Sequence, residues 1–451
     1  MTAWLPDYIW REGAFESGVA MSADSSGRIT DFSSDAADLA QAARLPGCAL
    51  LPGLINAHSH AFQRVIRGRT EQPSGASRDT FWTWREAMYR AANLLSPEAL
   101  YHAARMAFLE MLLSGITTVG EFHYLHHDPA GRPYEDRNLL ALQMLRAAED
   151  TGLRIALLRA AYVRGGQPRF LTPRLEDFVA DTEALSGRCK PGRSWVGIAP
   201  HSIRAVPLDY LLELGRYARA KALPVHMHVA EQPAEVEACI AEYGMPPVAL
   251  LHHHGILDER FTAIHAIHVT EQEIHQLGAA RSMVCACPTT ERNLGDGTCP
   301  ADRLTRAGVR IAVGSDSNIQ IDLLEDAREL EYHLRLERLE RVVLEPEALA
   351  PRLLGCATES GAASLAAPGG KLEVGRPADF FTVDLNDPSI AGADAESLAG
   401  NIVFSLQRTA VRDVYIAGQC IVRDGHHKLE EQILKNFADV QRGLSSSHRL
   451  C

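Results

Sequence analysis

The stretch LPGLINAHSHAFQR, which spans Leu51–Arg64, decides how this chain folds. It begins as an apolar run and ends in His58 and His60, with one serine between the two histidines. In a β-strand, residues i and i+2 face the same side, so both imidazoles are expected to point into the same space. Taken alone, the same residues also fit two solvated loop histidines. The stretch predicts a buried strand whose end offers two ligands to one metal ion, because imidazole binds zinc, iron, nickel and copper.

Other stretches of the chain repeat this pattern of a short apolar run followed by polar or charged residues. They are GITTVGEFHY (115–124), LRIALLRAAYVRGG (153–166), SWVGIAPHSIR (194–204), LPVHMHVAE (223–231), FTAIHAIHV (261–269), SMVCACPTTERN (282–293) and VRIAVGSDSN (309–318). Helix-like segments separate them, and one of these has Ser96 as its N-cap, Pro97 at its first position and Gly115 as its stop. Strands that alternate with helices predict a parallel sheet, and eight such units predict an α/β protein with a (β/α)8 TIM barrel. In that fold the catalytic groups lie at the C-terminal ends of the strands.

The two ends of the chain have a different pattern. VAMSADSSGRITDF near the N-terminus, and GRPADFFTVDL and VRDVYIAGQCIVRDG in the tail, read as short alternating strands with glycine and aspartate turns. We therefore expect a small composite β-sandwich domain built from both terminal segments, with the barrel inserted between them. The predicted parts are residues 1–50 and 366–427 for the small β-domain, 51–365 for the metal-dependent barrel, and 428–451 for a C-terminal helix and tail.

The composition limits the partners and the compartment. The 451 residues carry a formal net charge of −12, which on average repels polyanions such as nucleic acid. No apolar run reaches the roughly 18 residues of a membrane span, and the N-terminus lacks the pattern of a secretory signal. The nine cysteines are an odd number and are spread over a long chain, which favours reduced thiols in a cytosol over a set of disulfides. We expect a cytoplasmic protein with neither nucleic acid nor membrane as a partner, in which Cys285 and Cys287 are buried strand thiols.

Two further candidate ligands follow other predicted strands. They are His228, in LPVHMHVAE, and Asp316, in VRIAVGSDSN. Considered alone, His228 also fits a core histidine, and Asp316 also fits the N-cap of the next helix. If they lie on the same rim as His58 and His60, the four residues together would give a metal three nitrogens and one carboxylate. A catalytic zinc site of this kind keeps one position for water.

Two more residues on this rim are candidates for proton transfer. Glu231 lies three residues after His228, and a carboxylate beside an activated water molecule can take and return a proton. Glu231 also fits a surface glutamate at the start of the next helix. His265, in FTAIHAIHV, is the candidate for a second acid–base or electrophilic group. Asp316 or His265 is expected to accept the proton of the attacking water.

The motifs PGLINAHSH, HVAE, IHAIH and GSD, together with the tail, resemble the amidohydrolase superfamily, specifically its deaminase-like branch. The resemblance covers nearly the whole chain and implies a (β/α)8 barrel with a composite β-sandwich. It also implies a homodimer and one divalent metal, with zinc as the expected ion. The ligands it implies are His58, His60, His228 and Asp316. Dinuclear members carry a lysine at the end of the fourth strand, and IAPHSIR has none there, which argues for one metal.

Within this superfamily, HSHAFQRVIRG, FWTWREAMY, EFHYLHH and PHSIRAV resemble the enzymes that deiminate N-formimino-L-glutamate in histidine degradation. The likeness implies hydrolysis of the formimino group to give N-formyl-L-glutamate and ammonia, with Glu231 passing a proton to the departing nitrogen. The substrate contacts it implies are Gln63, Arg85, Tyr124, His201 and Arg204. A glutamate derivative carries two carboxylates, and arginine is the residue suited to bidentate carboxylate binding.

Two other functions remain open at this point. A nucleobase or nucleoside deaminase on the same scaffold would need a neutral pocket lined by amides and aromatic rings instead of Arg85 and Arg204. A non-catalytic barrel that serves as a binding or scaffold subunit should have lost a metal ligand or Glu231, and this chain keeps all of them. Fold alone does not decide between these functions.

Overall fold

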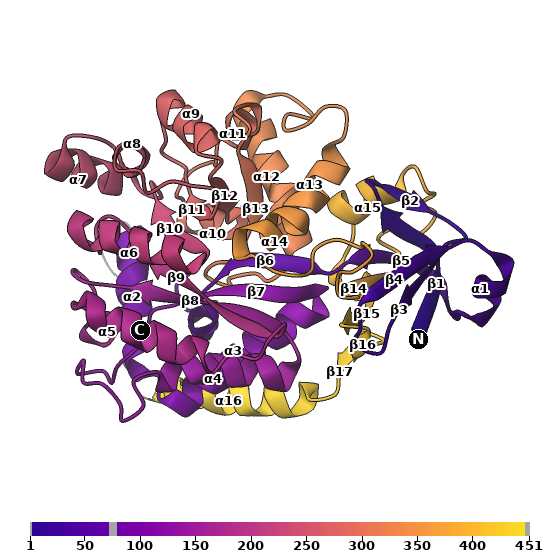
Figure 1. Ribbon diagram of the computed structural model, residues 1–451, viewed down its shortest axis with the longest axis horizontal. Helices are drawn as coiled ribbons and strands as arrows, with labels where there is room; N and C mark the ends of the chain where they lie inside the picture. Colours follow the sequence, from indigo (N-terminus) through magenta and orange to yellow (C-terminus); the bar gives the residue numbers. More distant parts are fainter. Residues whose placement is uncertain (1, 72–78, 447–451) are drawn as a thin grey trace.

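The computed structural model describes residues 2–71 and 79–446, and it consists of a parallel barrel with a second, smaller sheet beside it (Figure 1). The eight barrel strands lie in the order β13-β12-β11-β10-β9-β8-β7-β6. They span Leu54–Ser59 (β6), Ile116–His123 (β7), Arg154–Ala161 (β8), Ser194–Pro200 (β9), Val225–Val229 (β10), Phe261–His265 (β11), Met283–Ala286 (β12) and Arg310–Val313 (β13). Each predicted run contains one of these strands. A parallel bridge between Ser59 and Asp316 brings the end of the last strand back to the first. The predicted (β/α)8 barrel is confirmed.

Helices follow the strands and surround the barrel (Figure 1). They span Phe81–Leu94 (α2), Pro97–Leu113 (α3), Leu139–Thr151 (α4), Leu175–Ser186 (α5), Leu208–Lys221 (α6), Pro233–Tyr243 (α7), Pro247–His253 (α8), Glu271–Ala279 (α9), Pro288–Leu294 (α10), Ala301–Arg306 (α11), Leu323–Arg338 (α12), Leu349–Ala357 (α13) and Glu359–Leu365 (α14). The predicted cap of α3 is confirmed, because the Ser96 side chain accepts a hydrogen bond from the Ala99 amide at 3.1 Å. Gly115 ends this segment with a φ of +82°, a left-handed conformation that glycine adopts without strain.

The smaller sheet is built from both ends of the chain, as predicted. Its main path runs β17-β16-β15-β14-β5-β1-β3-β4, with β2 paired to β1. Its strands span Thr2–Arg11 (β1), Ala14–Glu16 (β2), Ala20–Ala23 (β3), Ile29–Ser33 (β4), Ala43–Pro52 (β5), Phe380–Asp384 (β14), Val411–Ile416 (β15), Gln419–Arg423 (β16) and His426–His427 (β17). The central pair β1 and β5 is parallel, and β5 is antiparallel to β14. The two terminal segments therefore meet in the middle of one sheet.

The remaining helices connect or cover these two bodies. They span Ala36–Gln41 (α1), Leu398–Phe404 (α15) and Glu430–Ser446 (α16). The last of these runs along the outside of the barrel beside α3 (Figure 1). The exact boundaries predicted between the parts stay predictions, and residues 447–451 of the predicted tail lie outside the described residues. Among the helices that the structure describes, none combines the length and the apolar character needed to cross a membrane.

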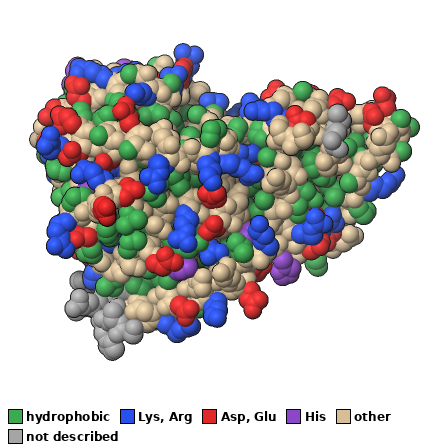
Figure 2. Space-filling model, turned by 60° about the horizontal axis from the view of Figure 1, so that its bottom comes forward, with side chains coloured by type: hydrophobic (Ala, Val, Ile, Leu, Met, Phe, Trp, Pro, Cys, Tyr) green, Lys and Arg blue, Asp and Glu red, His purple; other side chains and the backbone are tan. Residues whose placement is uncertain are grey.

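The surface carries both signs of charge. On the face shown in Figure 2, acidic and basic side chains are interspersed over the barrel and over the smaller sheet. The prediction that nucleic acid is not a partner stays a prediction.

A buried ion pair joins the barrel to the smaller sheet. The Arg154 Nε donates to Asp379 Oδ2 at 2.6 Å, and its Nη2 donates to Oδ1 at 2.9 Å. The Ala417 amide donates to the same carboxylate at 2.7 Å. Both charged side chains are at most 4% exposed. Because Arg154 begins β8 and Asp379 precedes β14, this pair fixes how the two bodies meet.

We predict that Arg154→Met lowers the free energy of unfolding by about 3–5 kcal/mol, because it leaves the Asp379 carboxylate buried without its cation. Urea denaturation followed by circular dichroism measures this loss. The control is Arg376→Met, which removes an exposed pair with Glu373 and should cost at most about 1 kcal/mol. Equal midpoints for both variants would show that the buried pair does not stabilise the seam.

Candidate metal centre and active site

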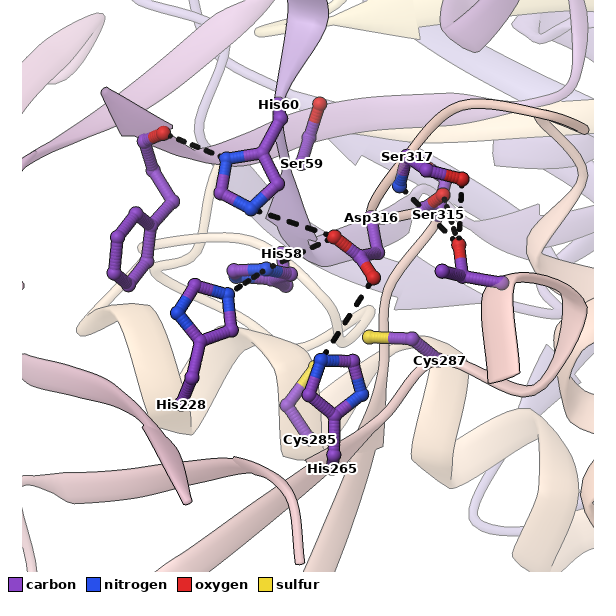
Figure 3. Close-up of polar contacts among 12 residues, drawn as sticks. His58, Ser59, His60, His228, His265, Cys285, Cys287, Ser315, Asp316 and Ser317 are labelled. Atoms are coloured by element: carbon purple, nitrogen blue, oxygen red, sulfur yellow. Dashed lines mark hydrogen bonds and ion pairs between the residues drawn. The ribbon is translucent and has the colours of Figure 1, made fainter. Parts of the chain in front are cut away.

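The four predicted metal ligands converge at the C-terminal end of the barrel (Figure 3). His58 lies in β6, His60 directly follows it, His228 lies in β10, and Asp316 follows β13. One ligand atom from each lies within 4.8 Å of the others, and all four residues are buried. The Nε2 atoms of His58 and His228 are 3.2 Å apart. Asp316 Oδ1 lies 3.3 Å from His58 Nε2 and 3.4 Å from His60 Nε2.

Hydrogen bonds to backbone carbonyls orient two of these imidazoles. The Nδ1–H of His60 donates to the carbonyl of Phe122 at 2.9 Å, and the Nδ1–H of His228 donates to that of His201 at 3.0 Å. A carbonyl oxygen only accepts, so each ring carries its proton on Nδ1 and turns an unprotonated Nε2 toward the centre. Such outer contacts fix the tautomer and the direction of metal-binding histidines.

The donor set fits a divalent cation. Burial lowers the pKa of His58 to about 3, so this ring is neutral at physiological pH. Burial would raise the pKa of Asp316, but its contacts with His58 and with the neighbouring imidazoles outweigh it, so the pKa lies below its usual range. Nitrogen lone pairs that face one another in a buried site repel unless a cation lies between them. Neutral imidazoles with one carboxylate are the ligands expected of zinc and similar metals.

His265 and Glu231 lie beside this ligand set. Glu231 is buried just after β10, and its Oε1 lies 3.6 Å from the Nε2 of His265. The same Nε2 lies 3.8 Å from Asp316 Oδ2. Burial raises the pKa of Glu231 to about 7, although the nearby His265 opposes the shift. Burial opposes protonation of His265, yet the surrounding carboxylates raise its pKa well above the usual range. The two side chains lie within ion-pair distance, so the protonation of one depends on that of the other.

Glu291 is a residue whose place the sequence reasoning missed. It is buried at the start of α10, and its Oε1 accepts hydrogen bonds from His265 Nδ1 at 3.1 Å and from the Cys287 amide at 2.8 Å. His265 itself has a φ of +72°, a left-handed conformation that is uncommon for a residue other than glycine. Glu291 thus fixes the orientation of the His265 imidazole at the point where the chain bends at the end of β11. The available signal was a glutamate just beyond the seventh strand.

The two cysteines on this side of the barrel are buried thiols, as predicted. Cys285 lies in β12, and Cys287 follows it. The Cys287 sulfur approaches His265 and Asp316 (Figure 3). Burial raises the pKa of the Cys287 thiol well above its usual range, so it remains protonated.

The five residues predicted as substrate contacts line one pocket with Glu231, His265 and Asp316. They are Gln63 in the 3-10 helix at 61–66, Arg85 in α2, Tyr124 after β7, and His201 and Arg204 after β9. The Gln63 amide donates to the Tyr124 hydroxyl at 3.0 Å. Their roles stay predictions, but the fold brings all of them to the metal centre.

The cationic groups of this pocket have no carboxylate partner in the part of the chain that the structure describes. Among the described residues, neither Arg85 nor Arg204 has a carboxylate within ion-pair distance, and the Nε atom of each is buried without a hydrogen bond. The Oε1 of Gln63 is buried and unbonded as well. Most buried polar atoms in proteins are hydrogen-bonded, so these unmet groups indicate a polar ligand with negative charge.

The fold and the site together define a class of protein. A (β/α)8 barrel with three imidazoles, one carboxylate and a buried glutamate at the C-terminal ends of its strands is a metal-dependent hydrolase. The model of the amidohydrolase family matches residues 49–421, and the chain belongs to this family. The family uses a divalent metal, in agreement with the ligand set.

Relatives of known name agree with this assignment. The chain is 37% identical over 450 residues to a formimidoylglutamate deiminase from Pseudomonas aeruginosa, with 97% of each chain covered. It is 32% identical to an amidohydrolase from Brucella melitensis of solved structure, with a TM-score of 0.88 over 98% of this chain and 100% of that one. An adenosine deaminase from Xanthomonas campestris with bound zinc shares the fold, with 24% identity and a TM-score of 0.85 over 99% of this chain and 98% of that one. The predicted family is confirmed.

Proposed function

We propose that the protein hydrolyses N-formimino-L-glutamate to N-formyl-L-glutamate and ammonia, a step of histidine degradation. The observation that carries the proposal is the pair of arginines without a described carboxylate partner, Arg85 and Arg204, in the pocket that three of the predicted metal ligands also line. The similarity to the Pseudomonas aeruginosa deiminase over nearly the full chain supports it.

The pocket offers cationic groups to the carboxylates of this substrate and a neutral ring to its uncharged part. Arg204 binds one carboxylate through its planar fork, and Arg85 holds the other with the Tyr124 hydroxyl. Burial, together with the charge of Arg204, lowers the pKa of His201 well below its usual range, so this ring is neutral. A neutral imidazole between the arginines and the metal ligands offers a hydrogen bond to the uncharged part of the substrate.

His58, His60, His228 and Asp316 would hold a divalent ion, which would supply an activated water molecule for hydrolysis at the formimino carbon. Asp316, or His265 when its imidazole is neutral, accepts the proton that this water loses. The new carbon–oxygen bond gives a tetrahedral intermediate, and Glu231 delivers a proton to its amino nitrogen. The carbon–nitrogen bond then breaks as the new hydroxyl group loses its proton to the same side chains. Both protons of the water thus end on the nitrogen, which leaves as ammonia, and the carbon retains the oxygen as a formyl group.

The finer assignments are part of the same proposal. We infer that the ion is zinc, that one equivalent is bound, and that the protein is a cytoplasmic homodimer. The zinc bound in the similar Xanthomonas campestris structure supports the choice of metal. Metal analysis and analytical ultracentrifugation test the first and the last of these assignments.

A nucleobase deaminase is the competing function, and the charge of the pocket argues against it. Purines and pyrimidines carry no carboxylates, so they would leave the half-buried Arg85 and Arg204 without an anionic partner. Ammonia release from N-formimino-L-glutamate, N-formimino-L-aspartate, guanine and cytosine separates the two functions. Turnover of guanine or cytosine without turnover of the formimino compounds would overturn the proposal.

We predict that Arg204→Met lowers kcat/KM on N-formimino-L-glutamate by about 30-fold or more, because a buried carboxylate that loses its cation costs roughly 2–5 kcal/mol. Arg204→Lys should recover only part of the loss, since a point charge lacks the planar fork. Metal content should stay at the wild-type level in both variants. Arg216→Met, which changes an exposed arginine of α6, is the control for general effects. Wild-type kinetics in Arg204→Met would contradict the assignment of an acidic substrate.

A further inference from the structure

Trp82, in α2, lies next to both arginines of the pocket. The Arg85 Cζ is 4.5 Å from the centroid of the Trp82 ring, and the Arg204 Cζ is 5.5 Å from it. The two arginines come from distant parts of the chain, one from α2 and the other from the loop after β9. One indole ring therefore connects the two cationic groups of the pocket.

This arrangement addresses an electrostatic problem. Two guanidinium groups near one ring in a partly buried site repel each other, and the repulsion grows as the surroundings become less polar. Neither group has a carboxylate within ion-pair distance among the described residues. The face of an indole ring is electronegative and attracts cations, so Trp82 offsets part of this repulsion before any substrate binds.

The two arginines differ in what else holds them. Arg85 also lies over the Tyr89 ring, at 5.4 Å, and the Tyr89 hydroxyl lies 3.0 Å from that of Tyr162, which follows β8. Arg85 is thus tied to the barrel through α2. For Arg204, Trp82 is the aromatic contact found among the described residues. Loss of the Trp82 ring should therefore release Arg204 more than Arg85.

We propose that Trp82 is a positioning residue that aligns Arg85 and Arg204 for the two carboxylates of the substrate, and so sets the preference for a dicarboxylate. The inference rests on the proposed function. Trp195, in β9, gives a contrast, because it packs against the hydrophobic core away from the residues that line the pocket, and its indole N–H donates to the carbonyl of Leu365 at 2.8 Å. Among the described residues, no arginine lies over its ring.

The first test is steady-state kinetics on the metal-loaded enzyme. Trp82→Leu should raise the KM for N-formimino-L-glutamate about 10-fold and leave kcat within about threefold, because the lost contact acts on binding and not on proton transfer. Trp82→Phe keeps an aromatic face and should recover part of the affinity, and it tests the same point if the leucine variant does not fold. An unchanged KM in both variants, or a loss in kcat alone, would overturn the inference.

The second test measures selectivity with simple probes. Glutarate carries two carboxylates and butyrate carries one, so the ratio of their dissociation constants reports how well the two arginines act together. Calorimetry should show that Trp82→Leu weakens glutarate about 10-fold and butyrate much less. Trp195→Leu is the matched control, which should lower the thermal midpoint without changing this ratio. A ratio that stays constant in Trp82→Leu, or that changes equally in Trp195→Leu, would show that Trp82 is only structural.

The two proposals fail in different ways. If the wild-type enzyme releases no ammonia from N-formimino-L-glutamate, the proposed function is wrong. Glutarate and butyrate binding still tests the role of Trp82 in that case, because it needs no turnover. If the wild type is active and the Trp82 variants bind glutarate as well as it does, only the inference about Trp82 is wrong.

Discussion

Replacement of Glu231 by glutamine should leave the KM nearly unchanged and lower kcat by about 10²- to 10⁴-fold. The amide has the shape of the carboxyl group but cannot carry a proton. Glu231 is buried within 3.6 Å of His265, and burial raises its pKa to about 7, so it can both accept and return a proton near neutral pH. General acid–base catalysis is most effective when the pKa lies near the working pH. Ammonia release under saturating substrate measures the effect.

A neighbouring carboxylate gives the control for this variant. Glu235 is also fully buried, but its Oε1 faces the amide of Ala230 at 3.3 Å, in the first turn of α7. Glu235→Gln should therefore keep most of the activity, whereas Glu231→Gln loses it. Both variants should bind the metal as the wild type does, since neither residue is a ligand. A Glu231→Gln enzyme with more than about a tenth of the wild-type rate would contradict its role in proton transfer.

Removal of the metal should abolish turnover, and one equivalent of a divalent ion should restore it. Without a cation, three imidazoles and a carboxylate remain buried together, and the water loses the acidity that a bound divalent ion confers. His58 is the most informative ligand to replace, because its side chain is fully buried and its Nε2 faces both His228 and Asp316. His58→Ala should lose metal and activity together.

The matched control for the ligand variant is His226, in the same strand as His228. Its Nε2 donates to the carbonyl of Ser364 at 2.9 Å, and it lies outside the group of ligand atoms. His226→Gln should keep one equivalent of metal. Elemental analysis after chelation and reconstitution, together with ammonia release, gives the result. Full activity in a metal-free preparation, or a need for two equivalents, would show that the single-metal assignment is wrong.

Much of the fold was predictable because its signals are local. The apolar composition of the run that ends in His58 and His60 predicts a strand. The spacing of two residues predicts that both imidazoles lie on the same side of that strand. The helix after Ser96 shows its start by the cap and the following proline, and its end by Gly115. Eight repeats of the same alternation favour one closed barrel, whose rim then collects the polar residues that follow each strand.

The candidate site was predictable only as a set of residue types on one rim. The sequence assigned the metal ligands and the pocket residues with the help of a family resemblance, and the structure places them together. The sequence did not show that Glu291 would accept a hydrogen bond from His265, because that contact depends on how the chain bends where β11 ends. It also did not place Trp82 between two arginines, since helix α2 and the loop after β9 meet only in the folded barrel.

The sequence by itself thus determined the elements, their order and the residues able to bind a metal. These properties depend on spacing along the chain and on which side chains prefer to be buried. The tertiary structure decided the distances, such as the 3.3 Å between His58 Nε2 and Asp316 Oδ1. Almost the whole barrel lies between these two residues in the sequence. That distance exists because the last strand returns to the first when the sheet closes, as the bridge between Ser59 and Asp316 records. Closure depends on the packing of all eight strands at once, and no local pattern of residues specifies it.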